Sequence, residues 1–122
     1  MFEFLRNSNK KDNTKNLLRV NVESTEQLDD ILALSQEKNV YIFKHSSRCG
    51  ISSVVLNRFE KQVKEKNETY FHVHIQGSRS LSNRIAEELK IRHESPQLIV
   101  LKNAKVLAHG SHYDILEIVP SL

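Results

Sequence analysis

The sequence predicts a single α/β domain in which a mixed central sheet is flanked by helices. The first observation is that apolar segments of strand length alternate with amphipathic segments of helical periodicity, in the order βαβαβαββα. The second is that 39% of the 122 residues are hydrophobic, which suits one compact core in a chain of this length. We therefore expect one domain at residues 17–122, preceded by a polar, flexible arm at residues 1–16.

The domain is predicted to begin with a short strand and a capped helix. Residues 17–22 have the composition of a strand, and Ser24 and Gln27 then have the spacing of a capping box. Apolar residues follow at helical spacing, so the helix should extend to residues 38–39. Residues 40–43 form a continuous apolar run, which is typical of a buried central strand.

The next helix is expected to start close to the single cysteine of the chain. Apolar side chains recur every three or four residues from Ile51 to Val63, the pattern of a helix that packs by one face. Residues 70–75 alternate between apolar and polar and predict a third strand. Residues 80–90 have the periodicity of another amphipathic helix.

The last elements are predicted to be a hairpin and a helix. Pro96 breaks any preceding helix, and residues 97–102 form the clearest strand of the sequence. A short loop leads into a strand at residues 106–111, which adds an antiparallel edge to the sheet. A final helix is expected at residues 113–119, with Pro120 as its end.

Composition argues against several classes of function. The 18 basic residues are nearly balanced by 15 acidic ones, and no basic stripe with aromatic residues points to nucleic acid. No apolar run has the length of a membrane span, and residues 1–6 lack the hydrophobic region of a secretory signal. One cysteine excludes an internal disulfide and an all-cysteine metal site. We expect a cytoplasmic monomer that binds neither nucleic acid nor membrane.

Cys49 is the candidate nucleophile because of its position. It lies between a predicted strand and a predicted helix, after the polar residues Ser46, Ser47 and Arg48. A thiol at a helix N-terminus meets unpaired backbone N–H groups and the positive end of the macrodipole, and both favour the thiolate. The alternative is a buried, inert cysteine that acts as a small hydrophobic residue.

Histidines are frequent, but their pattern does not predict a metal site. His72 and His74 point to one face of a strand, yet no third ligand follows at a useful spacing. We therefore expect no bound metal. His93, His109 and His112 are more readily explained by structural hydrogen bonds.

The element order, with a cysteine opening one helix and a proline opening the fourth strand, is the arrangement of the thioredoxin fold. Three segments between residues 17 and 119 resemble the YtxJ-like monothiol bacilliredoxin family. They are Ile42 to Ser52 (IFKHSSRCGIS), His93 to Gln97 (HESPQ) and Ser111-His112. In that family the cysteine exchanges disulfides with bacillithiol, a small thiol that bears a malate group, and removes it from client proteins. The resemblance therefore implies a monothiol disulfide exchange enzyme.

The resemblance also implies roles for residues around the cysteine. Cys49 is the expected nucleophile, and Ser52 stands where a dithiol thioredoxin has its resolving cysteine. The partners are then a low-molecular-weight thiol and S-thiolated clients. Bacillithiol is a co-substrate, an external thiol is the reductant, and no cofactor is bound. Gly50 departs from the proline that many members carry, which leaves this junction less rigid.

Neighbouring polar residues have both a functional and a structural interpretation. Ser52 lies one helical turn beyond Cys49, where its hydroxyl would donate to the thiolate or serve as an ordinary first-turn serine. Arg48 and Lys44 are expected to favour the thiolate and to bind malate carboxylates, the alternative being solvated surface charge. His45 is a weaker candidate for assisting the thiolate.

The Ser95-Pro96 pair is expected to complete the site. In thioredoxin-like folds this proline is cis and faces the nucleophile, while the backbone of the preceding residue binds an extended substrate. The alternative is a trans proline that only starts a strand.

Two other functions remain open. Cys-Gly-Ile-Ser differs by one residue from the Cys-Gly-Phe-Ser of monothiol glutaredoxins, so a dimer holding a [2Fe-2S] cluster through Cys49 is one alternative. The other is a thioredoxin-fold interaction module with an unreactive cysteine.

Overall fold

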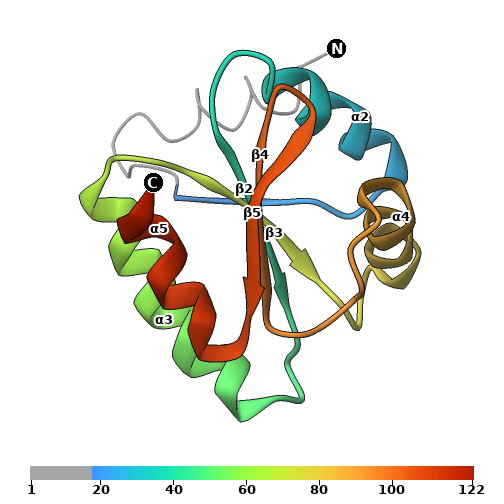
Figure 1. Ribbon diagram of the computed structural model, residues 1–122. Helices are drawn as coiled ribbons and strands as arrows, with labels where there is room; N and C mark the ends of the chain where they lie inside the picture. Colours follow the sequence, from blue (N-terminus) through green and yellow to red (C-terminus); the bar gives the residue numbers. More distant parts are fainter. Residues whose placement is uncertain (1–17) are drawn as a thin grey trace.

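The computed structural model describes residues 18–122, which form one five-stranded sheet with helices on both faces (Figure 1). The predicted arm at residues 1–16 lies outside the described residues. The elements are β1 (Arg19–Asn21), α2 (Thr25–Leu34), β2 (Val40–His45), α3 (Gly50–Glu65), β3 (Tyr70–His74), α4 (Arg79–Leu89), β4 (Gln97–Lys102), β5 (Lys105–Ser111), the 3-10 segment η1 (His112–Glu117) and α5 (Ile118–Ser121). The predicted α/β class and the predicted succession of strands and helices along the chain are confirmed.

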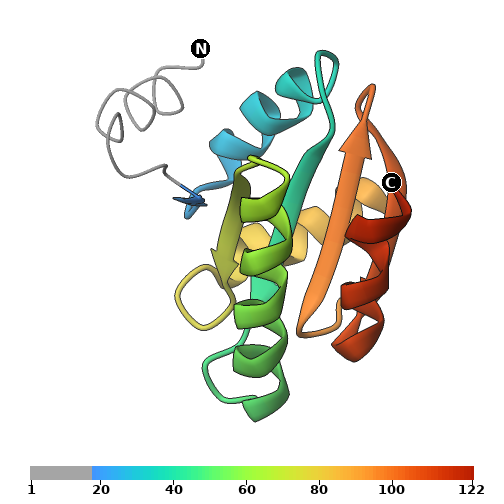
Figure 2. The same ribbon diagram turned by 90° about the vertical axis from the view of Figure 1, so that its left-hand side faces the viewer.

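The sheet is mixed and separates two apolar clusters. Its strand order is β1-β3-β2-β4-β5, with β1, β3 and β2 parallel and with β4 antiparallel to both of its neighbours. Helices α3 and α5 cover one face and α2 and α4 the other (Figures 1 and 2). Figure 2 shows α3 running along the sheet beside the C-terminal helical segment, which it contacts.

Alternation along β2 assigns its residues to the two faces. Tyr41 and Phe43 belong to the cluster under α3 and α5, and Ile42 belongs to the cluster under α2 and α4. The ring centroids of Phe43 and Phe59 of α3 lie 5.1 Å apart, so this helix is held directly against β2. Successive side chains of a strand point to opposite faces, so Lys44 and His45 separate in the same way.

Helix α2 ends earlier than predicted, at Leu34 rather than at residues 38–39. The Ser35 hydroxyl donates to the Leu32 carbonyl at 2.6 Å, which closes the last turn. Backbone N–H groups of Asn103 and Ala104 then donate to the Ser35 carbonyl and hydroxyl at 2.7 and 2.8 Å. A tertiary contact with the β4–β5 turn therefore sets this boundary. The predicted capping box at the start of α2 is confirmed.

The C-terminal helix also differs from the prediction. Residues 112–117 form a 3-10 segment, and α5 is a separate turn of α-helix. Pro120 lies inside α5 instead of ending it. A proline is tolerated there because the first turn of a helix has no acceptor for its backbone N–H groups.

Register brings two loops to one end of the sheet. Lys44 of β2 pairs with Gln97 of β4 in antiparallel register. The chain leaves β2 toward Cys49 at the same end at which it enters β4 from Pro96. The loop that leads to Cys49 and the loop that contains Pro96 therefore lie side by side at one end of two neighbouring strands. Within residues 18–122, no helix has the length and hydropathy that crossing a membrane requires.

Candidate active site

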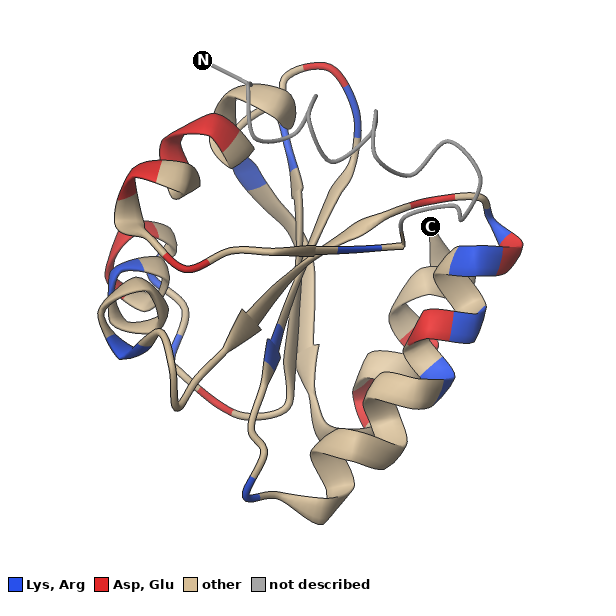
Figure 3. Ribbon diagram, turned by 180° about the vertical axis from the view of Figure 1, so that it is seen from behind, with Lys and Arg blue, Asp and Glu red and all other residues tan. Residues whose placement is uncertain are grey.

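Cys49 occupies the N-cap position of α3 and carries a half-buried free thiol. Its backbone N–H donates to the Ser46 carbonyl at 3.3 Å, and its own carbonyl accepts the Ser52 N–H at 3.1 Å. The first turn of α3 has no acidic residue, and Figure 3 shows charged residues only in its later turns. No acidic side chain of that turn therefore offsets the positive end of the α3 macrodipole at Cys49.

Gln76 fixes the loop that precedes Cys49. The Gln76 side-chain amide donates to the Ser46 hydroxyl at 2.9 Å and accepts the Ser47 backbone N–H at 3.1 Å. His74 Nε2 lies 3.2 Å from the Ser47 hydroxyl. No motif in the sequence marks Gln76, because its partners lie 29 and 30 residues earlier.

The Ser52 hydroxyl contacts His45 and the Ser46 backbone rather than the thiol of Cys49. Its side chain is fully buried, and its hydroxyl accepts the Ser46 backbone N–H at 3.1 Å and lies 2.7 Å from His45 Nδ1. None of the hydrogen bonds among residues 18–122 involves the Cys49 sulfur. The expected donation to the thiolate is thus replaced by a structural link between the start of α3 and the end of β2.

His45 and His72 form a polar layer beneath the start of α3. Their ring centroids lie 5.5 Å apart. Burial lowers the pKa of His45, with smaller effects of the same sign from His74 and Arg19. Burial lowers the pKa of His72 to about 4, and its Nε2 has no hydrogen-bond partner in the described part of the chain. No group of three or more potential ligands is placed to hold a metal there or elsewhere in residues 18–122.

Lys44 is where the sequence-based expectation is wrong. Its side chain is fully buried on the α4 face, opposite the side on which His45 meets Ser52. Its ammonium donates to the Ser82 carbonyl at 3.0 Å and lies 3.3 Å from His93 Nδ1. Burial lowers its pKa to about 8. Lys44 is therefore neither a solvated surface charge nor a free cation for a substrate carboxylate.

Arg48 and the Ser95-Pro96 pair belong to the two loops at this end of the sheet. Arg48 is exposed in the loop before Cys49, and it forms none of the ion pairs found among residues 18–122. The Ser95–Pro96 peptide bond is cis, which confirms that expectation. The Pro96 carbonyl accepts the backbone N–H of His112 at 3.1 Å, so the proline loop is tied to the start of η1.

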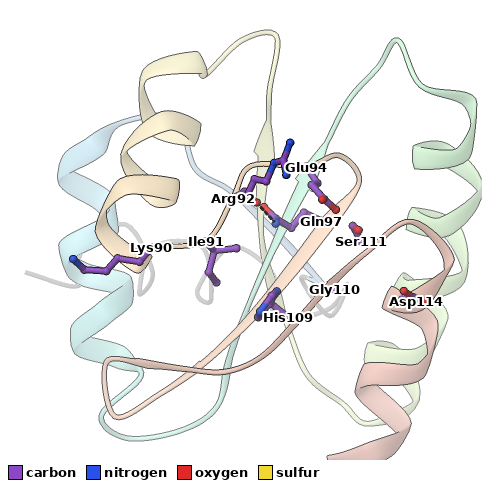
Figure 4. A pocket seen from close by; sticks show the side chains of 9 residues that line it. All are labelled: Lys90, Ile91, Arg92, Glu94, Gln97, His109, Gly110, Ser111 and Asp114. Atoms are coloured by element: carbon purple, nitrogen blue, oxygen red, sulfur yellow. Dashed lines mark hydrogen bonds between the residues drawn. The ribbon is translucent and has the colours of Figure 1, made fainter.

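A cavity of about 270 Å³ opens beside the proline loop on the edge of the sheet (Figure 4). Gln97 lies at its wall, donating to the Arg92 carbonyl at 2.9 Å, and its Oε1 has no partner in the described residues. Figure 4 shows the Lys90 side chain extending away from the other lining residues. These are Ile91, Arg92, Glu94, Gln97, His109, Gly110, Ser111 and Asp114.

A family model described as monothiol bacilliredoxin BrxC matches residues 20–118. The chain belongs to this monothiol bacilliredoxin family. The match includes Cys49, Pro96 and every residue of the sheet except Arg19 of β1. The family supports a thiol redox role for this site.

Solved structures agree on the fold of this bacilliredoxin. A protein described as an oxidoreductase with a thioredoxin fold aligns with a TM-score of 0.78 and 27% identity, covering 85% of this chain and 92% of its own. Thioredoxin from Trypanosoma brucei brucei aligns with a TM-score of 0.70 and 17% identity, covering 88% and 90%. Thioredoxin from Schistosoma mansoni gives 0.69 and 13%, covering 84% and 91%. These likenesses confirm the thioredoxin fold.

Proposed function

We propose that this protein is a monothiol oxidoreductase that removes bacillithiol from mixed disulfides on client proteins. The observation that carries the proposal is a half-buried lone cysteine at the N-cap of α3, next to a cis-proline loop, in a bacilliredoxin chain. A single cysteine has no intramolecular partner, so the second thiol must come from outside.

The reaction is two successive thiol-disulfide exchanges. The Cys49 thiolate attacks the bacillithiol sulfur of the mixed disulfide, and the bond between that sulfur and the client sulfur breaks. The client leaves as a thiolate and takes a proton from solvent, while Cys49 becomes linked to bacillithiol. An external thiol, as its thiolate, then attacks the bacillithiol sulfur and releases Cys49. Both steps are displacements at sulfur, so the proposed reaction needs no bound cofactor.

Arg48 is the residue proposed to meet the malate carboxylates. It is exposed beside Cys49, and no carboxylate of the described residues pairs with it. The exposed apolar side chains of Ile51 and Val54 follow Cys49 in the first turns of α3 and offer contact area for a client. We propose that the protein acts as a monomer on S-thiolated clients.

The test presents the purified protein with a single-cysteine client that carries bacillithiol and, separately, with the same client carrying glutathione. Mass spectrometry follows both proteins. We expect the bacillithiol adduct to appear on Cys49 as the client thiol is freed, and the Cys49→Ser variant to leave the client modified.

Two outcomes would contradict the proposal in different ways. If neither adduct moves although iodoacetamide alkylates Cys49, disulfide exchange is not the function. If glutathione moves as fast as bacillithiol, the exchange is correct and the assigned small thiol is wrong. Arg48→Ala should slow transfer of bacillithiol more than alkylation by the neutral iodoacetamide.

A further inference from the structure

The ammonium group of Lys44 contacts His93, and this contact fixes which ring nitrogen of His93 carries the hydrogen. Its Nζ lies 3.3 Å from His93 Nδ1 and 3.0 Å from the Ser82 carbonyl oxygen. An ammonium has donors and no acceptor, so a charged Lys44 requires His93 Nδ1 to be the acceptor. The Ser82 hydroxyl also lies 3.3 Å from this nitrogen, where it can only add a second donor.

An imidazole with an acceptor at Nδ1 is neutral and carries its hydrogen on Nε2. His93 is exposed, whereas the residues that bind its Nδ1 are buried, so the protein side of the ring is Nδ1 and the solvent side is Nε2. His93 lies two residues before Ser95 in the loop that carries the cis peptide bond. The exposed Nε2–H is therefore a hydrogen-bond donor in the loop that carries the cis peptide bond.

We propose that Lys44 holds His93 in the Nε2–H tautomer, and that His93 thereby offers this N–H to an acceptor oxygen of the substrate beside Pro96. His93 is then a specificity-determining residue, and Lys44 is a positioning residue that acts through it. The identity of the substrate rests on the proposed function, whereas the tautomer does not.

The surrounding charges favour the neutral form of His93. Partial desolvation of the ring, whose Nδ1 side faces the protein, lowers the pKa of His93, and the positive charges of Lys44 and of Arg79 in α4 lower it further, while Glu94 in the same loop opposes them. Burial alone lowers the pKa of Lys44, to about 8, so Lys44 is still mostly charged at neutral pH. The contact between Lys44 Nζ and His93 Nδ1 requires a charged lysine as the donor and a neutral histidine as the acceptor, and these pKa shifts are compatible with both states at neutral pH.

The direct test is nitrogen NMR of the imidazole rings in the unmodified protein at pH 7. We expect His93 Nδ1 to show the resonance of an unprotonated nitrogen and Nε2 that of a protonated one. The Lys44→Met variant should give averaged resonances, and Lys44→Arg, which keeps a donor-only cation, should retain the wild-type pattern. Lys102→Met removes an exposed lysine from β4 and should change nothing.

The wild-type spectrum decides the first half of the proposal without any variant. An Nδ1–H tautomer, or an even mixture of both tautomers, would overturn it. Retention of the wild-type pattern in a folded Lys44→Met protein would show that another group sets the tautomer.

Kinetics of adduct transfer test the second half. His93→Ala should raise KM for the client mixed disulfide about fivefold and leave kcat within about twofold, as loss of one hydrogen bond predicts. His93→Gln, whose amide N–H can replace Nε2–H, should recover part of this loss. An unchanged KM in His93→Ala would exclude contact with substrate, and a fall in kcat alone would point to a structural role. If bacillithiol does not transfer at all, the proposed function fails while the spectrum still decides the tautomer.

Discussion

Lys44 and His45 are neighbours in β2, yet they support opposite faces of the site in different ways. On the α3 face, His45 contacts the hydroxyl of Ser52, and the hydrogen bonds run to the loop before Cys49. On the α4 face, Lys44 is a buried cation that joins Ser82 to His93 in the proline loop. One strand end thus supports both loops of the site, by a neutral hydroxyl network on one face and by a buried charge on the other.

Ser52 and Ser82 are both buried, but the stability of the fold should depend on the side chain of Ser52 more than on that of Ser82. Ser52 contributes its hydroxyl, which is the only acceptor that the Ser46 N–H meets among residues 18–122. Ser82 contributes mainly its backbone carbonyl, which no substitution removes. Four experiments test this contrast.

The largest effect is expected from removing the Ser52 hydroxyl. Ser52→Ala leaves the Ser46 N–H buried without an acceptor and His45 Nδ1 without its contact, so the free energy of unfolding should fall by about 2 to 3 kcal/mol. Ser82→Ala is the matched control on the other face and should cost about 0.5 kcal/mol, since it removes one long contact. Urea unfolding measures both, and equal losses would refute the contrast.

Acid should lower the free energy of unfolding through His72, which lies on the α3 face. Burial lowers the pKa of His72 from 6.5 to about 4. Between these two pH values His72 is protonated in the unfolded chain but neutral in the folded protein, so the unfolded chain binds more protons. Stability is therefore lost as pH falls through this window, by about 2 kcal/mol after allowance for solvent screening. His72→Phe should flatten the profile, and His109→Phe, at an exposed histidine, should not. A steep acid profile in His72→Phe would assign it to other groups.

Alkaline pH should raise the free energy of unfolding, because it removes the buried charge of Lys44 on the α4 face. The pKa of Lys44 is lowered from 10.5 to about 8, so above pH 8 the folded protein releases a proton that the unfolded chain keeps. Stability then rises with pH, and between pH 7 and 9.5 wild type should gain about 1 to 2 kcal/mol relative to Lys44→Met. Chemical unfolding at the two pH values measures this difference. No difference between the two proteins would mean that Lys44 is not desolvated as its burial indicates.

The smallest effect is expected at the loop before Cys49. Gln76→Ala removes the acceptor of the Ser47 N–H, so hydrogen exchange of this amide should accelerate about tenfold, with about 1 kcal/mol lost in global stability. Gln36→Ala, at an exposed position after α2, serves as the control. Unchanged exchange at Ser47 would show that the loop is fixed without Gln76.

Local patterns were sufficient for most of the fold. Apolar spacing from Ile51 to Val63 predicts α3, and continuous apolar runs predict β2 and β4. Each of these signals depends on residues within a few positions of one another. The end of α2 could not be predicted in this way, because Ser35 is held by a turn 68 and 69 residues later in the chain.

That Cys49 opens a helix and that a proline loop precedes β4 follows from the sequence alone, because the residues that start helices and break them act within a few positions of the chain. The face of the sheet on which each polar neighbour of Cys49 makes its contacts depends instead on how distant parts of the chain pack together. Lys44 finds its partners 38 and 49 residues away, and Ser52 turns from the sulfur toward His45. A lysine beside a strand end is usually solvated, and only the packing of α4 over β2 makes Lys44 a buried link to the proline loop.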